Sequence, residues 1–273
     1  MKSLFKTASR QDAAVRSVHT MRKKCVALIL LCAAFFALSC SKKASPKLYI
    51  FAAASTTDAV NELIEKYKQT ENPKFEFATS YASSGDLAKQ IVDGGADANI
   101  FISANTEWVK YLEDKGKAEP GTKFLFGKNS IVIVTPKKNE ALFNNPKDLA
   151  SMEGKLAMGD PKHVPAGQYG RDALTYYGVF DALTKGKKIA YYSDVRQTLN
   201  AVELEQADYG IVYKTDAVKS TKVAIIYEFP AESHKSVEYP ACAVSGNSTP
   251  EAKNFLDFMQ SETGREIITK YGF

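Results

Sequence analysis

Small residues and hydroxyl side chains gather at two points where a predicted strand passes into a predicted helix. Residues 53–58 (AASTTD) follow the apolar run 48–52, and residues 81–85 (YASSG) follow the run 74–79. At such a junction the unpaired N–H groups of the first helical turn face outward, together with the positive end of the helix dipole. This arrangement can bind an anion. Ser, Thr and Asp are also preferred N-caps, so a junction taken alone is more often a cap than a ligand site.

Other reactive side chains are scattered along the sequence. His163 and His234 could be metal ligands or bases, but they lie in separate segments with no matched third ligand, and we expect them to be structural or exposed. Arg196 directly follows a predicted helix start, and we expect its side chain to face solvent or a carboxylate. The sequence has no G-x-S-x-G elbow, Walker loop or paired-cysteine motif, so no enzyme signature is present.

Short apolar strands alternate with amphipathic helix patterns from residue 47 onward. This alternation predicts an α/β fold with open, largely parallel sheets and helices on both faces. The predicted strands are 48–52, 74–79, 99–103, 130–135, 156–158, 210–213, 224–229 and 239–244. The predicted helices are 57–70, 85–94, 107–115, 167–177, 194–205, 250–260 and 262–271.

The composition is that of a globular protein with an unevenly distributed charge. The 273 residues are 45% hydrophobic and 11% aromatic, which is enough for one large core or two smaller ones. The formal net charge of +5 comes from lysines and arginines before residue 40, so the remainder is close to neutral. A region with almost no net charge has no electrostatic field that would attract nucleic acid. Nucleic acid is therefore not expected as a partner. Any bound anion must be held by local geometry.

The N-terminal region has the pattern of a secretory signal. Residues 22–24 (RKK) precede an uncharged run at 25–39 (CVALILLCAAFFALS). This run is shorter than the ~20 apolar residues that a membrane-spanning helix needs, so a permanent span is the weaker interpretation. A start at Met21 would give the signal a normal length. We therefore predict a signal peptide at 1–39.

The cysteine after this run is a predicted lipid attachment site. Residues 37–40 (ALSC) resemble a relaxed bacterial lipobox, which implies acylation of Cys40 and a flexible lipidated tether at 40–46. Ordinary cleavage near Ser39 is the alternative. After processing, Cys242 would be the remaining cysteine, which excludes a disulfide framework. Its apolar surroundings predict a small core residue.

Several short segments together resemble the periplasmic molybdate-binding proteins of ABC importers. They follow one another in that family's order, and the resemblance covers the region from residue 47 to the C-terminus. The combination of AAAS, HVPAG and GIVYKTDA is highly specific, whereas any single segment is not. The segments are FAAAS (51–55), YASS (81–84), NIFIS (99–103), GDPKHVPAG (159–167), DVR (194–196), GIVYKTDA (210–217), FPAESH (229–234) and YGF (271–273).

The resemblance implies a two-lobed periplasmic-binding-protein class II fold, with mainly parallel sheets flanked by helices and the ligand between the lobes. Lobe one would consist of residues 47–126 and 231–273, and lobe two of residues 127–230. The chain would then pass twice between the lobes. A hinge with two crossings is expected to close around a ligand.

The resemblance also implies which groups hold the anion. Carried over by motif, they are the hydroxyls of Ser55 and Ser84 from lobe one, and from lobe two the amides of Ala166 and Val195 and the hydroxyl of Tyr213. A fully deprotonated oxyanion only accepts hydrogen bonds, so neutral donors suit it without direct cation ligands. Fixed dipoles in a closed cavity also select by size, which would favour molybdate or tungstate over the smaller sulfate.

Three positions near these groups depart from the family pattern. Thr56 replaces an apolar residue and Gly85 replaces a serine, which leaves Ser83 as an alternative to Ser84 for the second hydroxyl. Lys128 is inserted into the family's Gly-Asn-Ser segment, where the first crossing between the lobes is expected.

The signal pattern and the family resemblance together imply an exported solute-binding protein that captures molybdate or tungstate for an ABC importer. Its expected partners are the small oxyanion, the permease subunits, and the membrane through the lipid anchor on the periplasmic or cell-surface side. We expect a monomer with no cofactor and no enzymatic activity. The alternatives are a binder of another tetrahedral oxyanion, sulfate or phosphate, and an enzyme, because class II lobes also occur in transferases.

Overall fold

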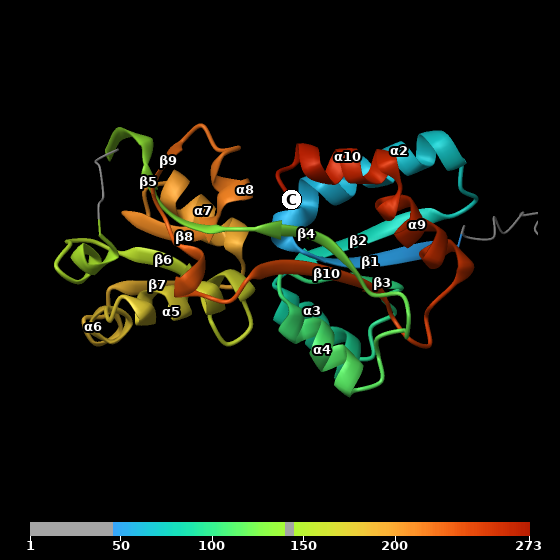
Figure 1. Ribbon diagram of the computed structural model, residues 1–273, viewed down its shortest axis with the longest axis horizontal. Helices are drawn as coiled ribbons and strands as arrows, with labels where there is room; N and C mark the ends of the chain where they lie inside the picture. Colours follow the sequence, from blue (N-terminus) through green and yellow to red (C-terminus); the bar gives the residue numbers. More distant parts are fainter. Residues whose placement is uncertain (1–45, 140–144) are drawn as a thin grey trace, which may run out of the picture. The chain divides into compact units, whose positions relative to one another are not determined.

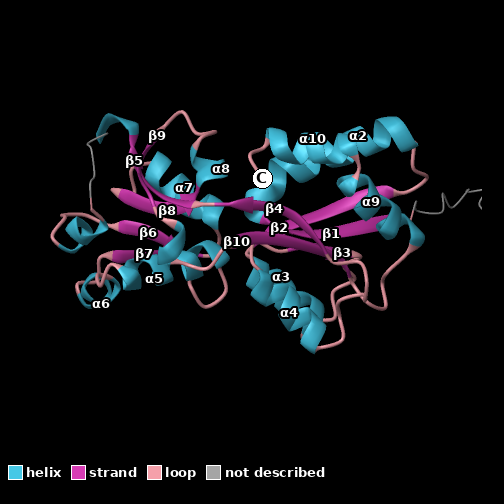
Figure 2. Cartoon of the chain, viewed as in Figure 1, coloured by secondary structure: helices cyan, strands magenta, loops and turns pink. Residues whose placement is uncertain are grey.

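The computed structural model describes residues 46–139 and 145–273, and these residues build two β-sheets (Figures 1 and 2). The predicted signal peptide and the predicted acylation site Cys40 lie outside the described residues, as does nearly all of the predicted tether. Within the described ranges, no helix combines the length and the apolar character needed to cross a membrane.

The first sheet consists of β1 (Lys47–Ala53), β2 (Glu76–Ala82), β3 (Ile100–Ile102), β4 (Phe124–Asn129) and β10 (Val237–Ala243). Its strand order is β2-β1-β3-β10-β4. β1 is parallel to β2 and β3, whereas β10 is antiparallel to β3 and β4. The helices around it are α2 (Thr57–Glu71), α3 (Ser84–Val92), α4 (Thr106–Asp114), α9 (Pro250–Gln260) and α10 (Glu262–Lys270). In Figure 1, α2, α9 and α10 cover one face of this sheet, and α3 and α4 cover the other.

The second sheet consists of β5 (Ile131–Pro136), β6 (Leu156–Gly159), β7 (Ile189–Tyr192), β8 (Tyr209–Tyr213) and β9 (Val223–Glu228). Its order is β7-β6-β8-β5-β9, with β6 parallel to β7 and β8 and β5 antiparallel to β8 and β9. The helices around it are α5 (Pro165–Tyr176), α6 (Phe180–Lys185), α7 (Val195–Glu203) and α8 (Lys214–Ala217). Short 3-10 turns are η1 (Ala54–Thr56), η2 (Lys137–Asn139), η3 (Pro146–Ala150) and η4 (Ala231–Ser233).

The chain passes between the sheets twice. β4 ends at Asn129 in the first sheet and β5 begins at Ile131 in the second, and the chain returns between Glu228 and Val237 through η4. Residues 127–129, which the sequence assigned to the second lobe, are therefore the last residues of a strand in the first sheet.

Amphipathic helices supply much of the core against the first sheet. In α2, residues Ala59, Val60, Leu63, Ile64 and Tyr67 are buried, and their spacing places them on one helix face. The Tyr67 ring meets Phe255 of α9 edge-on, with ring centroids 5.1 Å apart. Fully burying a side chain such as Leu63 stabilises the fold by roughly 1.5–3 kcal/mol. This packing holds α2 against the sheet, and the helix begins after β1 and the short turn η1.

The two-lobed α/β fold is confirmed, but the pairing of the strands differs from the prediction. Each sheet contains two parallel and two antiparallel pairings, so the sheets are mixed instead of mainly parallel. The sequence did not predict β4 because Gly127 and Lys128 interrupt its apolar pattern. Gly127 is required there, since a Cβ atom would lie 2.5 Å from the Cβ of Phe273.

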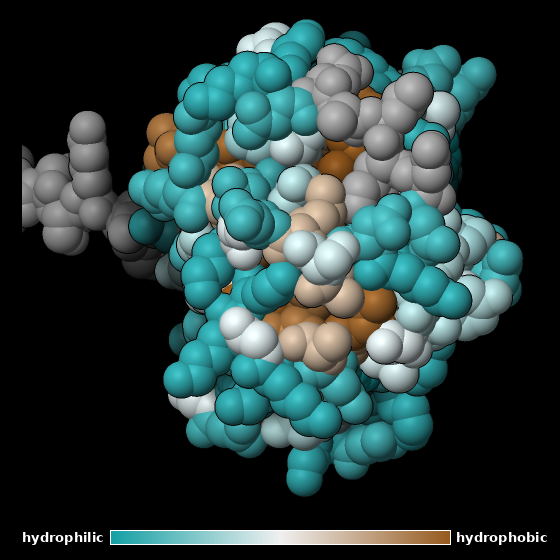
Figure 3. Space-filling view, turned by 90° about the vertical axis from the view of Figure 1, so that its left-hand side faces the viewer, coloured by the Kyte–Doolittle hydropathy of each residue, from teal (hydrophilic) through white to brown (hydrophobic). Residues whose placement is uncertain are grey.

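The end of the molecule formed by the second sheet has a mainly hydrophilic surface, with apolar residues gathered in smaller areas (Figure 3). Among the described residues, the large apolar side chains with the greatest exposure include Val218 at 63% and Tyr176 at 57%. Scattered exposed apolar side chains are ordinary on globular proteins, so they indicate no particular partner.

Candidate functional site

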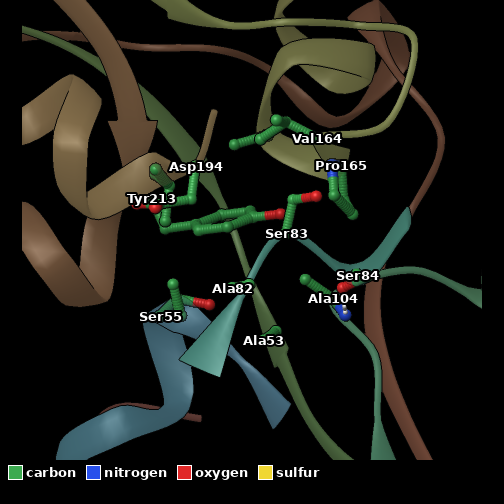
Figure 4. Close-up of a pocket in the computed structure, with 13 residues that line it drawn as sticks. Ala53, Ser55, Ala82, Ser83, Ser84, Ala104, Val164, Pro165, Asp194 and Tyr213 are labelled. Carbon is green, nitrogen blue, oxygen red and sulfur yellow. Dashed lines mark hydrogen bonds between the residues drawn. The ribbon is translucent and has the colours of Figure 1, made fainter. Parts of the chain in front are cut away.

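A small pocket lies where the ends of β1 and β2 meet the first turns of α5 and α7 (Figure 4). All five groups that the sequence analysis selected line it. The cavity volume is about 10 Å³, far below the ~300–1,000 Å³ of sites for organic ligands. Its size therefore indicates a small ligand. The lining residues are Ala53, Ala54, Ser55, Ala82, Ser83, Ser84, Ala104, Val164, Pro165, Ala166, Asp194, Val195 and Tyr213.

Helix starts surround this pocket. α3, α5 and α7 begin at its wall, and the turn η1 leads from β1 into α2 beside it. Pro165 is the first residue of α5 and has no N–H, so Ala166 carries the first amide donor of that helix. The N-cap residue of α5, Val164, makes no side-chain cap hydrogen bond. The amide of Val195 lies at the equivalent first turn of α7. First-turn N–H groups have no partner within their own helix and can donate to a ligand.

Backbone amides hold two of the serine hydroxyls at the pocket in place. Ser84 Oγ accepts a hydrogen bond from the Ala104 amide at 2.9 Å, and Ser83 Oγ accepts one from the Asp86 amide at 3.1 Å. Each of these serines keeps its own O–H for another acceptor. Both line the pocket, so Ser83 and Ser84 remain alternatives. Thr56 differs, because its hydroxyl donates to the Ala53 carbonyl at 2.8 Å.

Tyr213 is the last residue of β8, and its ring lies across the pocket in Figure 4. The side chain is only 1% exposed, and its hydroxyl makes no hydrogen bond of normal geometry. Mainly because the side chain is buried, the pKa of Tyr213 lies well above its ordinary value. The Tyr239 hydroxyl lies nearby and also raises the pKa of Tyr213. The phenol is therefore protonated at neutral pH and can donate a hydrogen bond to a ligand.

Cationic side chains do not line the pocket: its residues, all within the described ranges, include no lysine, arginine or histidine. The Asp194 carboxylate is occupied as the N-cap of α7, where it accepts from the Gln197 amide at 2.9 Å and from Gln197 Nε2 at 2.8 Å. In the part of the chain that the structure describes, no group of three or more His, Cys, Asp or Glu residues could hold a metal ion. The pocket thus offers neutral donors to a small anion.

Arg196 follows Val195 but faces away from the pocket lining. Its Nη2 lies 2.7 Å from Asp58 Oδ2, and its Nε lies 2.8 Å from Asp216 Oδ1. The prediction that this side chain faces a carboxylate is confirmed. Cys242 is also placed as predicted, since it is fully buried and burial raises the pKa of its thiol to about 12.

Neither histidine lines the pocket. His163 contributes its backbone carbonyl, which accepts a hydrogen bond from the Gly85 amide at 3.0 Å. A Cβ atom on Gly85 would lie 2.5 Å from that carbonyl oxygen, so glycine allows this close approach. His234 packs edge-on against Tyr169 with ring centroids 5.8 Å apart. Both residues therefore have the structural placement that the sequence predicted.

Two residues next to the pocket could not be predicted from the sequence. Tyr239 places its hydroxyl 3.0 Å from Ser55 Oγ, and Asn129 Nδ2 lies 3.4 Å from the same tyrosine hydroxyl. Tyr239 lies in an apolar strand, and Asn129 lies at a strand end. Neither position has a local pattern that indicates a role in binding.

Comparisons with known proteins agree with this geometry. The family model for bacterial extracellular solute-binding proteins matches residues 48–273. The chain is 40% identical over 243 residues to the molybdate-binding protein ModA of Haemophilus influenzae, covering 86% of this chain and 93% of that protein. It is 40% identical over 228 residues to the putative ABC transporter substrate-binding lipoprotein YvgL of Bacillus subtilis, covering 83% and 85%.

Solved structures show the same fold at lower sequence identity. The periplasmic molybdate-binding protein of Azotobacter vinelandii aligns with a TM-score of 0.72 at 23% identity, covering 82% of this chain and 97% of that one. The sulfate-binding protein SubI of Mycobacterium tuberculosis aligns with a TM-score of 0.70 at 15% identity, covering 84% and 86%. At these identities the likeness concerns the fold alone.

Proposed function

Because the chain belongs to the family of bacterial extracellular solute-binding proteins, we propose that it captures molybdate or tungstate and delivers it to an ABC importer. The observation that carries this proposal is the pocket, where neutral donors from several helix starts converge without a cation. The 40% identity to a protein named for molybdate binding supports the choice of ligand.

In this proposal the anion accepts hydrogen bonds from both sheet regions. Ser55 and Ser84 would donate from the first, and Tyr213 would donate from the second, together with the amides of Ala166 and Val195. Each of these groups lines the pocket. A fully deprotonated oxyanion has acceptors alone, so donors from rigid elements can hold it without a counter-ion. No cofactor is needed for this task.

Sulfate and phosphate are the competing ligands. Phosphate carries at least one proton throughout the neutral pH range and would need an acceptor, whereas the one carboxylate among the described residues that line the pocket, Asp194, already accepts two hydrogen bonds from Gln197. Sulfate is fully deprotonated but smaller than molybdate, so a closed pocket with fixed donors would fit it less well. These two arguments favour molybdate and tungstate.

Calorimetric titration of the purified protein with molybdate, tungstate, sulfate and phosphate tests the proposal. Molybdate and tungstate are expected to bind, and sulfate and phosphate to bind far more weakly. Thermal melting gives a second readout, because a ligand at a hundred times its dissociation constant adds about 2.7 kcal/mol to native stability. Equal binding of sulfate would contradict the choice of ligand, and the absence of any binding would contradict the function.

We also propose that the protein works as an exported monomer anchored to the membrane through Cys40, and that it is not an enzyme. The basic segment and lipobox-like sequence support the anchor. Neither His163 nor His234 lies in the pocket lining, where it could act as a base for the serines. Replacing Cys40 by Ala should release the protein from the membrane fraction. Continued membrane attachment of that variant would contradict the anchor.

A further inference from the structure

We propose that Tyr239 and Asn129 are positioning residues that turn the Ser55 O–H into the pocket as a hydrogen-bond donor. The inference rests on the proposed function, because it concerns how the same pocket is prepared for an anion that only accepts hydrogen bonds. Neither residue lines the pocket. They act through Ser55, whose Oγ lies 3.0 Å from the Tyr239 hydroxyl.

The orientation of the Asn129 amide is the first step. Its Oδ1 accepts from the Ser130 amide at 2.9 Å and from the Thr215 amide at 3.4 Å. Both of these groups are donors, so the oxygen of the side chain must face them. The nitrogen then faces Thr215 Oγ1 at 2.8 Å and the Tyr239 hydroxyl at 3.4 Å. An amide nitrogen of this kind can only donate.

The Tyr239 hydroxyl therefore accepts from Asn129, and its own hydrogen must find an acceptor elsewhere. The side chain has no exposed surface, so water cannot serve. A buried hydroxyl hydrogen without a partner costs free energy. The Tyr213 hydroxyl is also near, but no hydrogen bond of normal geometry joins it to Tyr239. Ser55 Oγ lies at 3.0 Å, which favours donation to Ser55. Ser55 is only 1% exposed and then accepts on its protein side. Its remaining O–H is left to donate to a ligand in the pocket.

The other two pocket serines also accept a hydrogen bond from the protein and keep their O–H free to donate. Ser84 Oγ accepts from the Ala104 amide and Ser83 Oγ accepts from the Asp86 amide, so each is held by a backbone donor from behind. Ser55 differs because its donor is a side chain. One substitution at Tyr239 can therefore remove the hydrogen bond that orients Ser55.

Asn129 also links the donor orientation of Ser55 to the point where the chain crosses from the first sheet to the second. It ends β4 in the first sheet, while Thr215 lies in α8 beside the second sheet. The same side-chain amide thus contacts both regions at the point where the chain passes from one to the other. The donor state of Ser55 is consequently tied to the arrangement that brings Thr215 to Asn129.

A double-mutant cycle on molybdate affinity tests the pair Tyr239 and Ser55. Tyr239→Phe keeps the ring, which packs against Tyr213 and Phe273 with centroids 5.6 and 5.0 Å away, and deletes the hydroxyl. We expect roughly tenfold weaker molybdate binding, the lower end of what second-layer partners of a binding site typically contribute. In the Ser55→Ala background, the same change should cost almost nothing further, because the group it positions is gone.

Tyr169→Phe is the matched control. Tyr169 is also a buried tyrosine, and its hydroxyl contacts the carbonyls of Ala104 and Ser236 at 3.4 and 3.3 Å instead of Ser55. Its effect on affinity should be additive with that of Ser55→Ala. The melting midpoint of each variant without ligand identifies any loss that comes from the fold.

The outcomes separate this inference from the proposed function. Unchanged affinity in Tyr239→Phe, or an equal loss in both backgrounds, would overturn the positioning role while molybdate binding by the parent stands. If the parent binds sulfate instead, the ligand assignment fails and the cycle is measured with sulfate. A parent that binds none of the four oxyanions overturns both.

Discussion

The pocket and the ion-pair cluster beside it use opposite chemistry at adjacent positions of the chain. Val195 lines the pocket and presents a backbone amide, whereas Arg196 directs its guanidinium to carboxylates. We define the ion-pair cluster as Asp58, Arg196, Asp216 and Lys219. Its members come from α2 of the first sheet region and from α7, α8 and the residues after α8 in the second.

Ion pairs of the cluster link the two regions. Asp58 on α2 receives both Arg196 at 2.7 Å and Lys219 at 3.5 Å. Lys219 also lies 4.2 Å from the centre of the Tyr271 ring, next to α10. The carboxylates satisfy the nearby cations, so neither cation is free to attract an anion of arbitrary size.

Under the proposed function, this difference separates the contacts between the two regions from the recognition of the ligand. A cation in the pocket would bind many anions, because charge attraction is not directional. Fixed N–H and O–H donors bind only where an acceptor of the right size can reach them together. In the proposed function, the ion pairs link the two regions and the neutral dipoles choose the ligand.

Val195→Pro should have the largest effect on binding. Proline suits the first position of α7, and Asp194 before it is already extended, so the helix start should be preserved. The substitution removes the amide donor and puts a ring carbon in its place. Affinity for molybdate should fall by about 3 kcal/mol, the upper range for a hydrogen bond to a charged group, in calorimetric titration. Val195→Ala retains the amide and should bind nearly as the parent does.

Tyr213→Phe should cost slightly less. The change keeps the ring and removes a buried donor, so affinity should fall by about 1.5–3 kcal/mol while the melting midpoint without ligand stays almost unchanged. Ser55→Ala should produce a similar loss from the other sheet region. His163→Ala and His234→Ala are controls that should have little effect. Parent-like binding by Tyr213→Phe, with binding abolished in a histidine variant, would contradict the assignment of the donors.

Asp216 should make stability depend on pH. Burial raises the pKa of Asp216 to about 7, and this shift is partly offset by Arg196 and Lys219, whereas Asp58 and Asp194 add to it. A carboxyl whose folded pKa is raised stabilises the fold below its unfolded pKa, and that contribution is lost as pH rises through the folded pKa. Between about pH 4 and 7, the loss is on the order of 1 kcal/mol per pH unit.

The measurement is the unfolding free energy across that range for the parent and for Asp216→Asn. The variant should lack this decline, so the difference between the two proteins should change steadily with pH. A constant difference would show that Asp216 does not titrate in this window.

Asp58→Asn should have the smallest effect. The Asp58 side chain is 41% exposed, so solvent screens its pairing with Arg196 and Lys219. Exposed ion pairs typically contribute ~0.2–1 kcal/mol, and we expect a loss of affinity of that size that shrinks as salt is added. Glu65→Gln is the control, because its ion pair with Lys68 lies within one helix and should leave affinity unchanged. A salt-independent loss would argue that Asp58 does not act through charge.

Local sequence patterns predicted the helices and strands that frame the pocket, but they could not predict how distant strands pair. The start of α2 after β1 and the start of α3 after β2 follow from apolar runs that end in small residues and hydroxyls. The antiparallel neighbours of β10 and β5 depend on contacts between segments far apart in the chain, so periodicity contains no signal for them.

Some residues of the candidate site could likewise be predicted from the sequence, and others could not. Ser55 and the first turn of α5 lie in recognisable segments, so the resemblance to a family could select them. Tyr239 is 184 residues away from Ser55, and its hydroxyl meets that serine only because β10 returns to the first sheet. Asp58 and Arg196 are likewise 138 residues apart. Such partners become visible only when the fold places them together.

The most direct test is a crystal structure of the protein grown with tungstate, with data collected at the tungsten absorption edge to locate the metal. We predict one anomalous peak in the pocket, with tungstate oxygens about 2.7–3.2 Å from the hydroxyls of Ser55, Ser84 and Tyr213 and from the amides of Ala166 and Val195. A peak beside Arg196 or Lys219, with the pocket empty, would contradict recognition by neutral donors.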